Sequence, residues 1–168
     1  MTKSLSKTID DFRNFYKQNK ESVIISLEDV SKKSLSIIKM SLMNNNINII
    51  EEYNSDEKIE LYDSEMMQVV LNILSNSQDI LKEKTIKDPY IKITTEDRSI
   101  SICDNGGGIA EDIIEKIFDP YFSTKSEKNG TGLGLYMSKT IVENHHNGKL
   151  SIENTDDGVC FTIKLGKI

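Results

Sequence analysis

SISICDNGGGI, residues Ser99–Ile109, is the stretch that decides the fold: an alternating strand ends at a carboxylate, and three glycines follow. Successive side chains of a strand point to opposite faces, so Ile100, Ile102 and Asp104 share the apolar face. A carboxylate on that face is costly without a hydrogen-bonding partner, which indicates that a ligand brings the donor to Asp104. Glycines at 106–108 let the backbone turn and approach a bulky group closely. Taken alone, the stretch is equally typical of a strand that ends in an Asp-Asn turn.

Composition predicts one globular domain. The chain has 168 residues, of which 37% are hydrophobic and 29% charged, enough for one well-packed core. Its net charge is −6 and its lysines lie among acids, which argues against a nucleic-acid surface but is compatible with a nucleotide that brings its own metal ion. The two cysteines, Cys103 and Cys160, lie in alternating strand patterns, so we predict no disulfide framework and a reducing cytoplasmic setting. No leader and no apolar run of bilayer length is apparent.

Hydrophobic periodicity predicts strands interleaved with helices. Apolar residues at helical spacing indicate helices over residues 3–18, 27–43, 63–84, 111–118 and 130–145. Alternation indicates strands over residues 23–27, 47–53, 59–61, 90–95, 99–104, 149–153 and 159–165. Asp63 or Ser64 is predicted to cap the long helix. Residues 119–129 are too long and polar for a simple connection and are typical of a lid.

The last strand indicates how these elements are layered. Val159 and Phe161 face one way while Cys160 and Thr162 face the other, so one face of the sheet is wet. All helices should then cover the opposite face. The prediction is an α/β fold, a two-layer α/β sandwich whose mixed sheet carries its helices on one face.

The long helix predicted over residues 63–84 carries one polar stripe. Gln68, Asn72, Asn76 and Asp79 follow at spacings of four, four and three, which places them on one face. Apolar residues flank the stripe on both sides, so the stripe suggests a ligand or a metal ion. Without other motifs, an ordinary amphipathic helix with a narrow solvated face is the better interpretation.

Four motifs follow one another along the chain: NILSN at 72–76, DNGGG at 104–108, FDPYFSTK at 118–125 and GTGLGL at 130–135. In this order they resemble the N box, first glycine box, F box and second glycine box of the ATP-binding catalytic domain of sensor histidine kinases. That domain belongs to the GHKL superfamily of gyrase, heat-shock chaperone and mismatch-repair ATPases. The resemblance covers about residues 22–168 and implies the Bergerat ATP-binding fold. Each motif alone is weak, but four in order are specific.

The resemblance implies ATP and Mg²⁺ as ligands. Asp104 would accept a hydrogen bond from the adenine amino group, and Asn76 would hold Mg²⁺ through its amide oxygen. Amides after Gly130 and Gly132 would meet the phosphates at a helix start. Lys125, in the lid, would add positive charge, although a solvated loop lysine is an almost equal alternative.

The resemblance carries over two sets of positions. The catalytic set is Asn72, Asn76 and Lys125. The nucleotide-binding set is Asn76, Asp79, Asp104, Gly106, Gly108, Ile109, Phe118, Phe122, Thr124, Gly130, Thr131, Gly132, Leu133, Gly134 and Leu135.

Asn72 is the most informative of these positions. Hydrolytic members of the superfamily carry a water-activating glutamate one turn before the metal-binding Asn, whereas this chain has an amide, which is no general base. The resemblance therefore implies the kinase branch, which passes the γ-phosphoryl to a histidine. The alternatives are a GHKL protein-serine kinase or hydrolytic ATPase, and a non-catalytic nucleotide-binding module.

The resemblance also implies partners outside this chain. TIDDFRNF at 8–15 resembles the end of a dimerisation helix, so we expect residues 1–20 to end a histidine-acceptor domain and residues 21–168 to be the catalytic domain. The only histidines, His145 and His146, are better explained as residues at a helix C-terminus. Expected partners are the upstream acceptor domain, a response-regulator receiver domain and a second copy in a homodimer, but no nucleic acid. The expected location is cytoplasmic, with a membrane anchor in the parent protein left open.

Overall fold

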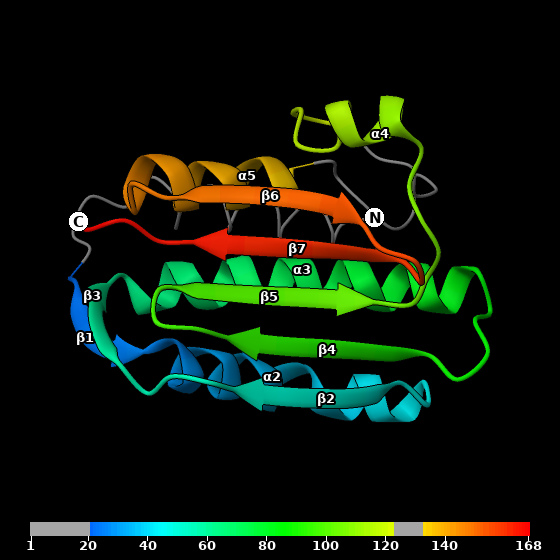
Figure 1. The fold of residues 1–168 in the computed structure, drawn as a ribbon, viewed down its shortest axis with the longest axis horizontal. Helices are drawn as coiled ribbons and strands as arrows, with labels where there is room; N and C mark the ends of the chain where they lie inside the picture. The colour runs from blue at the N-terminus through cyan, green and yellow to red at the C-terminus, as the bar shows by residue number, and fades with distance from the viewer. Residues whose placement is uncertain (1–20, 123–132) are drawn as a thin grey trace, which may run out of the picture.

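A mixed five-stranded sheet is the centre of the structure, a computed structural model that describes residues 21–122 and 133–168 (Figure 1). The strand order is β2-β4-β5-β7-β6, in which β2 and β4 are parallel and every other pair is antiparallel. The elements of this part of the chain are β1 (Val23–Ser26), α2 (Leu27–Asn44), β2 (Asn48–Tyr53), β3 (Lys58–Leu61), α3 (Asp63–Glu83), β4 (Tyr90–Thr95), β5 (Ser99–Asp104), α4 (Glu111–Lys116), α5 (Gly134–Thr140), the π-helical turn η1 (Ile141–His145), β6 (Lys149–Asn154) and β7 (Val159–Lys164).

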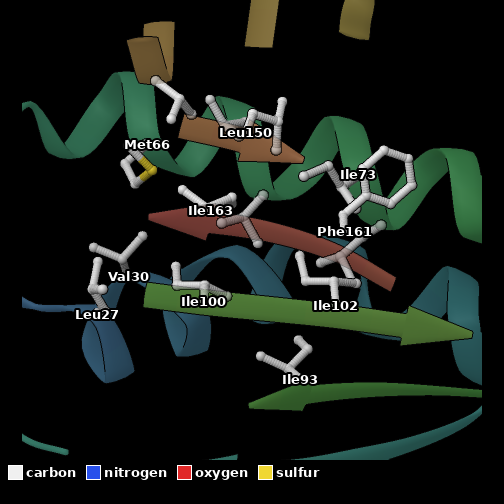
Figure 2. Close-up of a cluster of buried hydrophobic side chains, with 14 of the residues drawn as sticks. Leu27, Val30, Met66, Ile73, Ile93, Ile100, Ile102, Leu150, Phe161 and Ile163 are labelled. Carbon is white, nitrogen blue, oxygen red and sulfur yellow. The ribbon is translucent and has the colours of Figure 1, made fainter. Parts of the chain in front are cut away.

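Helices α2, α3 and α5 lie on one side of the sheet, and the core lies between them and the strands (Figure 1). Figure 2 shows Ile100 and Ile102 of β5 beside Phe161 of β7, with Met66 and Ile73 of α3 behind them. All five side chains are buried, each worth about 1.5–3 kcal/mol relative to an exposed position. The predicted sandwich, a mixed sheet with its helices on one face, is confirmed. Strands β1 and β3 form a separate antiparallel pair.

The start of α3 differs from the prediction. The residue before the helix is Tyr62, which makes no side-chain capping bond, while Asp63 is already inside the first turn. The predicted cap at Asp63 or Ser64 is therefore wrong. The Tyr62 backbone N–H instead donates to Nε2 of His146, 3.1 Å away. A contact across 84 residues thus fixes the helix entry, and no local pattern could reveal it.

The helix predicted over residues 130–145 also differs. Residues 130–132 lie outside the described part of the chain; α5 begins at Gly134, and its last turn is the π-helical η1. His146 follows it and is fully buried. Because its Nε2 accepts from Tyr62, its Nδ1 carries the proton and donates to the carbonyl of Ile141 at 3.0 Å.

The pairing of the two cysteines contradicts the prediction of no disulfide framework. The antiparallel register of β5 and β7 places Cys103 directly opposite Cys160, with a Cα–Cα distance of 4.1 Å, and the two sulfurs are bonded. Cysteine count and spacing could not show this, because 57 residues separate the pair and only the register brings them together. The pairing also removes the argument that led from the cysteines to a reducing setting. Among the described helices, none is both long and apolar enough to cross a membrane.

Candidate functional site

Asp104 ends β5 on its buried face, as the alternation predicts. The side chain is 2% exposed. Its Oδ1 accepts from the Gly106 amide at 2.9 Å, while Oδ2 has no hydrogen-bond partner among the described residues. A buried acceptor of this kind is rare in a folded protein and indicates a donor that a ligand supplies.

Burial raises the pKa of Asp104, because the low-dielectric interior disfavours the charged form. The Gly106 amide, the Ser77 hydroxyl and the Lys84 ammonium act in the opposite direction. The Ser77 oxygen is buried and makes no hydrogen bond of normal geometry to a described residue. We therefore attribute its effect on the Asp104 pKa to its closeness to the carboxylate. These three groups therefore offset only part of the cost of burying the ionised Asp104 carboxylate, which remains a hydrogen-bond acceptor.

The glycines after Asp104 fit tightly between α3 and the end of β6. A Cβ on Gly106 would lie 2.8 Å from Cγ2 of Ile80, so this position requires glycine to pack against α3. Gly107 has a φ of +85°, which glycine adopts without strain. A Cβ on Gly108 would lie 3.2 Å from Oδ1 of Asn154. The backbone here approaches its neighbours more closely than a side chain would allow.

The polar stripe of α3 connects two of the predicted motifs. Asn72 donates through Nδ2 to the Gly134 carbonyl at 3.3 Å and to Oγ of Ser138 at 3.1 Å, at the start of α5. Two turns later, Ile80 contacts the first glycine box at Gly106. Asn76 lies between these positions on the same helix. The N box therefore lies between the first glycine box and the start of α5, which begins in the second glycine box. Gln68, Asn76 and Asp79 are all partly buried.

The aromatic residues after α4 lie against the sheet and α5. The Phe118 ring contacts Phe161 edge-on, with centroids 6.4 Å apart, and Nζ of Lys139 lies 5.1 Å from the Phe118 centroid. Phe122 is half-buried, and its amide donates to the carbonyl of Asp119.

Other predicted site residues divide into two groups. Leu133 is buried, and Ile109 and Leu135 pack partly buried against the core. Thr124, Lys125, Gly130, Thr131 and Gly132, with most of the predicted lid, lie outside the described residues.

Three residues at this site were missed by the sequence analysis: Ser77, Lys84 and Asn154. Lys84 donates to the carbonyl of Gly106 at 2.9 Å, just beyond the end of α3. Ser77 adjoins Asn76 but faces the interior, which the periodicity of the helix could have indicated. Asn154 carried no signal, because an Asn that ends an edge strand usually belongs to the following turn.

The described residues contain no group of three or more His, Cys, Asp or Glu side chains that could hold a metal ion. Asp104 lies beside the backbone of Gly106, close to the end of α3.

Comparison with known proteins shows the family of this chain. Residues 62–167 match the family described as "Histidine kinase-, DNA gyrase B-, and HSP90-like ATPase". The sensor histidine kinase ZraS of Salmonella typhimurium is 32% identical over 144 residues, which cover 84% of this chain and 30% of that protein. The chain thus spans less than a third of this relative.

Solved structures of a histidine kinase are similar to this chain in fold and sequence. The catalytic domain of histidine kinase ThkA, in a nucleotide-free form, is 31% identical with a TM-score of 0.76, over 88% of this chain and 98% of that one. The structure of ThkA in complex with the response regulator protein TrrA has a TM-score of 0.78 at 26% identity, over 99% of this chain and 49% of that one. The chain therefore belongs to the histidine kinase-, DNA gyrase B- and HSP90-like ATPase family, within which it is an ATP-binding catalytic domain of the sensor histidine kinase type.

Proposed function

We propose that this domain binds Mg-ATP and passes the γ-phosphoryl to a histidine on a dimerisation domain outside residues 21–168. The observation that carries this proposal is Asp104, a buried carboxylate with one oxygen unpartnered among the described residues. The adenine amino group is a donor that matches this acceptor. The fit needs an ionised carboxylate, which accepts only, and so disfavours the carbonyl that guanine carries at the same place.

Asn72 supports transfer rather than hydrolysis. Its amide nitrogen donates to both Gly134 and Ser138, so α3 and α5 are joined through a donor at this position. A glutamate has no donor when ionised and would place its charge against the Gly134 carbonyl. The water-activating residue of the hydrolytic branch is thus incompatible with this contact.

The remaining roles follow from the motifs. Asn76 would hold Mg²⁺ through its amide oxygen, with phosphate oxygens and water as the other ligands. The bound ion supplies charge neutralisation at the phosphates. Asp79, Gly106, Gly108, Ile109, Phe118, Phe122, Leu133, Gly134 and Leu135 would surround the nucleotide, together with Thr124, Gly130, Thr131 and Gly132, and Lys125 would approach the phosphates.

The same proposal names the partners. Residues 1–20 would end the acceptor domain and residues 21–168 form the catalytic domain, as part of a cytoplasmic homodimer. A response-regulator receiver domain would take the phosphoryl group next, which is consistent with the ThkA structure that contains a response regulator protein.

Isothermal titration tests the nucleotide half of the proposal. The domain is expected to bind a non-hydrolysable ATP analogue more tightly with Mg²⁺ than without, and Asp104→Asn should nearly abolish binding. An amide can turn its NH₂ toward the adenine NH₂, whereas its oxygen can still accept from Gly106. Binding by the variant within a few-fold of wild type would contradict the assignment of Asp104.

Radiolabelled ATP tests the transfer. Positioning of the acceptor and electrostatic stabilisation provide most of the catalysis of phosphoryl transfer, so the isolated domain should turn ATP over very slowly and not label itself. Adding the histidine-bearing hairpin in trans should produce an acid-labile phosphohistidine, and Asn76→Ala should prevent it. Labelling of His145 or His146, or brisk hydrolysis, would favour the hydrolytic alternative.

A further inference from the structure

The side chain of Asn154 forms two hydrogen bonds with the backbone of Ile109. Its Oδ1 accepts from the Ile109 N–H at 2.8 Å, and its Nδ2 donates to the Ile109 carbonyl at 2.8 Å. The amide thus satisfies both backbone groups of one residue, as a neighbouring strand would. Asn154 lies in none of the four motifs.

The sheet places Asn154 beside the end of β5. Val159 of β7 is paired with Asp104 on one side and with Asn154 on the other. In Figure 1, the arrows of β5 and β6 accordingly point to the same end of the sheet, where the chain leaves β5 toward α4. The side chain of Asn154 therefore reaches the glycine segment, which we define as residues 105–109.

Other groups hold the inner part of this segment. The Asn105 side chain accepts from the Tyr90 amide at 2.8 Å and donates to the Asp88 carbonyl at 3.0 Å. Lys84 donates to the Gly106 carbonyl, and the Gly107 amide donates to the Asp157 carbonyl. Each of these contacts lies closer to β5 than Ile109 does.

Asn154 makes the outermost contact of the glycine segment. Beyond Ile109 the chain enters α4, which has no buried residue. Without Asn154, the backbone N–H and C=O of Ile109 would lose these two hydrogen bonds, and beyond Gly107 the packing of the Ile109 side chain would remain. Glycines lose more conformational freedom on ordering than other residues, so this part of the segment is costly to order.

We propose that Asn154 is a positioning residue that holds the outer end of the glycine segment in the shape that receives the nucleotide. It acts through Ile109 and need not touch the nucleotide. Preorganisation of this kind raises affinity because the ordering cost is met before binding. This inference rests on the proposed nucleotide binding at Asp104.

The chemistry of the side chain explains why an amide is needed. A side-chain amide offers a donor and an acceptor side by side, as the N–H and C=O of Ile109 require. An aspartate accepts from the Ile109 N–H but repels the Ile109 carbonyl, an alanine makes neither bond, and a glutamine is one methylene too long. Gly108 belongs to the same arrangement, because a Cβ there would crowd Oδ1 of Asn154 at 3.2 Å.

The test measures ATP-analogue affinity and amide exchange in Asn154→Ala. We expect affinity to fall about five- to tenfold and the Ile109 amide to exchange at least tenfold faster, with a melting temperature within a few degrees of wild type. Asn154→Asp should retain slow exchange at the Ile109 amide, and its affinity for the analogue should lie between those of wild type and Asn154→Ala. Asn54→Ala is the matched control, because it removes an exposed amide that donates to Glu96 elsewhere on the domain.

Gly108→Ala provides an independent variant that disturbs the same contact from the other side. It should reproduce the lower affinity and the faster exchange at Ile109. Affinity of Asn154→Ala within twofold of wild type, or unchanged exchange at Ile109, would overturn the inference. If Asp104→Asn loses binding while Asn154→Ala does not, only the role of Asn154 fails; if Asp104→Asn still binds, the proposed function itself fails.

Discussion

At the scale of single residues, Asp104 combines the recognition role proposed for it with a cost to stability. The proposed adenine contact needs an ionised acceptor, but burial raises the pKa of this carboxyl above its ordinary value of 3.8. The folded state therefore binds the proton more tightly than the unfolded state. The contribution of Asp104 to the free energy of unfolding therefore falls as the pH rises from 3.8 through the raised pKa of the folded state.

Asp104→Asn should consequently be at least as stable as wild type at pH 7, although it loses nucleotide binding. The advantage should shrink as pH falls toward 3.8, because the wild-type carboxyl becomes neutral there. Thermal unfolding followed by circular dichroism between pH 4 and pH 8 measures the difference. A variant that is clearly less stable than wild type at pH 7 would show that the charged carboxylate stabilises the fold.

Asn72→Glu tests the contact between α3 and α5. The substitution removes two hydrogen bonds and leaves the Gly134 carbonyl facing a carboxylate, so we expect a loss of about 1–3 kcal/mol in the free energy of unfolding. Urea denaturation measures it, with Gln68→Glu on the same stripe as the control. Brisk ATP hydrolysis by the Asn72→Glu variant would contradict the structural role assigned here.

At the scale of elements, the disulfide joins β5 and β7 immediately beside Asp104. Replacing both Cys103 and Cys160 with serine should lower the free energy of unfolding by about 2–4 kcal/mol under oxidising conditions, because the unfolded chain regains its freedom. Wild type should lose the same amount on reduction, whereas the double variant should not respond to reductant. A melting temperature of wild type that is unchanged by reductant would contradict this prediction.

The elements also show where inference from sequence succeeds. Strands β5 and β7 were predicted because Ile100, Ile102, Phe161 and Ile163 alternate with polar residues, a pattern that depends only on neighbouring residues. Asp104 was predicted to be buried for the same reason. Strand formation and the burial of alternate side chains depend on neighbouring residues, so the sequence pattern predicts both.

Properties that depend on distant pairing could not be predicted in the same way. The Tyr62 N–H before α3 is bound by His146, the partner of Cys103 comes from the register of β5 on β7, and the contact of Asn154 with Ile109 crosses 45 residues. Each requires knowledge of which strands and helices are neighbours. The motif resemblance supplied that arrangement for the nucleotide site, but not for residues outside the motifs.

At the scale of the whole molecule, ligand binding should appear as added stability. At an analogue concentration of about 100 times the dissociation constant, with Mg²⁺, the gain is about 2.7 kcal/mol. For a domain of this size, that corresponds to a rise in melting temperature of roughly 5–10 °C. Differential scanning fluorimetry measures the rise, which Asp104→Asn should abolish and Asn54→Ala should retain. An equal rise in the Asp104→Asn variant would mean that the nucleotide binds elsewhere.

The π-helical turn η1 has a consequence for the phase of the helix that it ends. A π turn contains one residue more than an α turn covering the same arc, so α5 and η1 together hold an extra residue before the chain enters β6. Deleting the exposed Asn144 would return the helix to an unbroken α phase. His146 would then occupy the place where His145 now meets Glu65 at 2.9 Å, and Asn147 would occupy the buried place beneath Tyr62. The extra residue therefore decides which side chain fills each place: with it, His145 meets Glu65 and His146 lies beneath Tyr62.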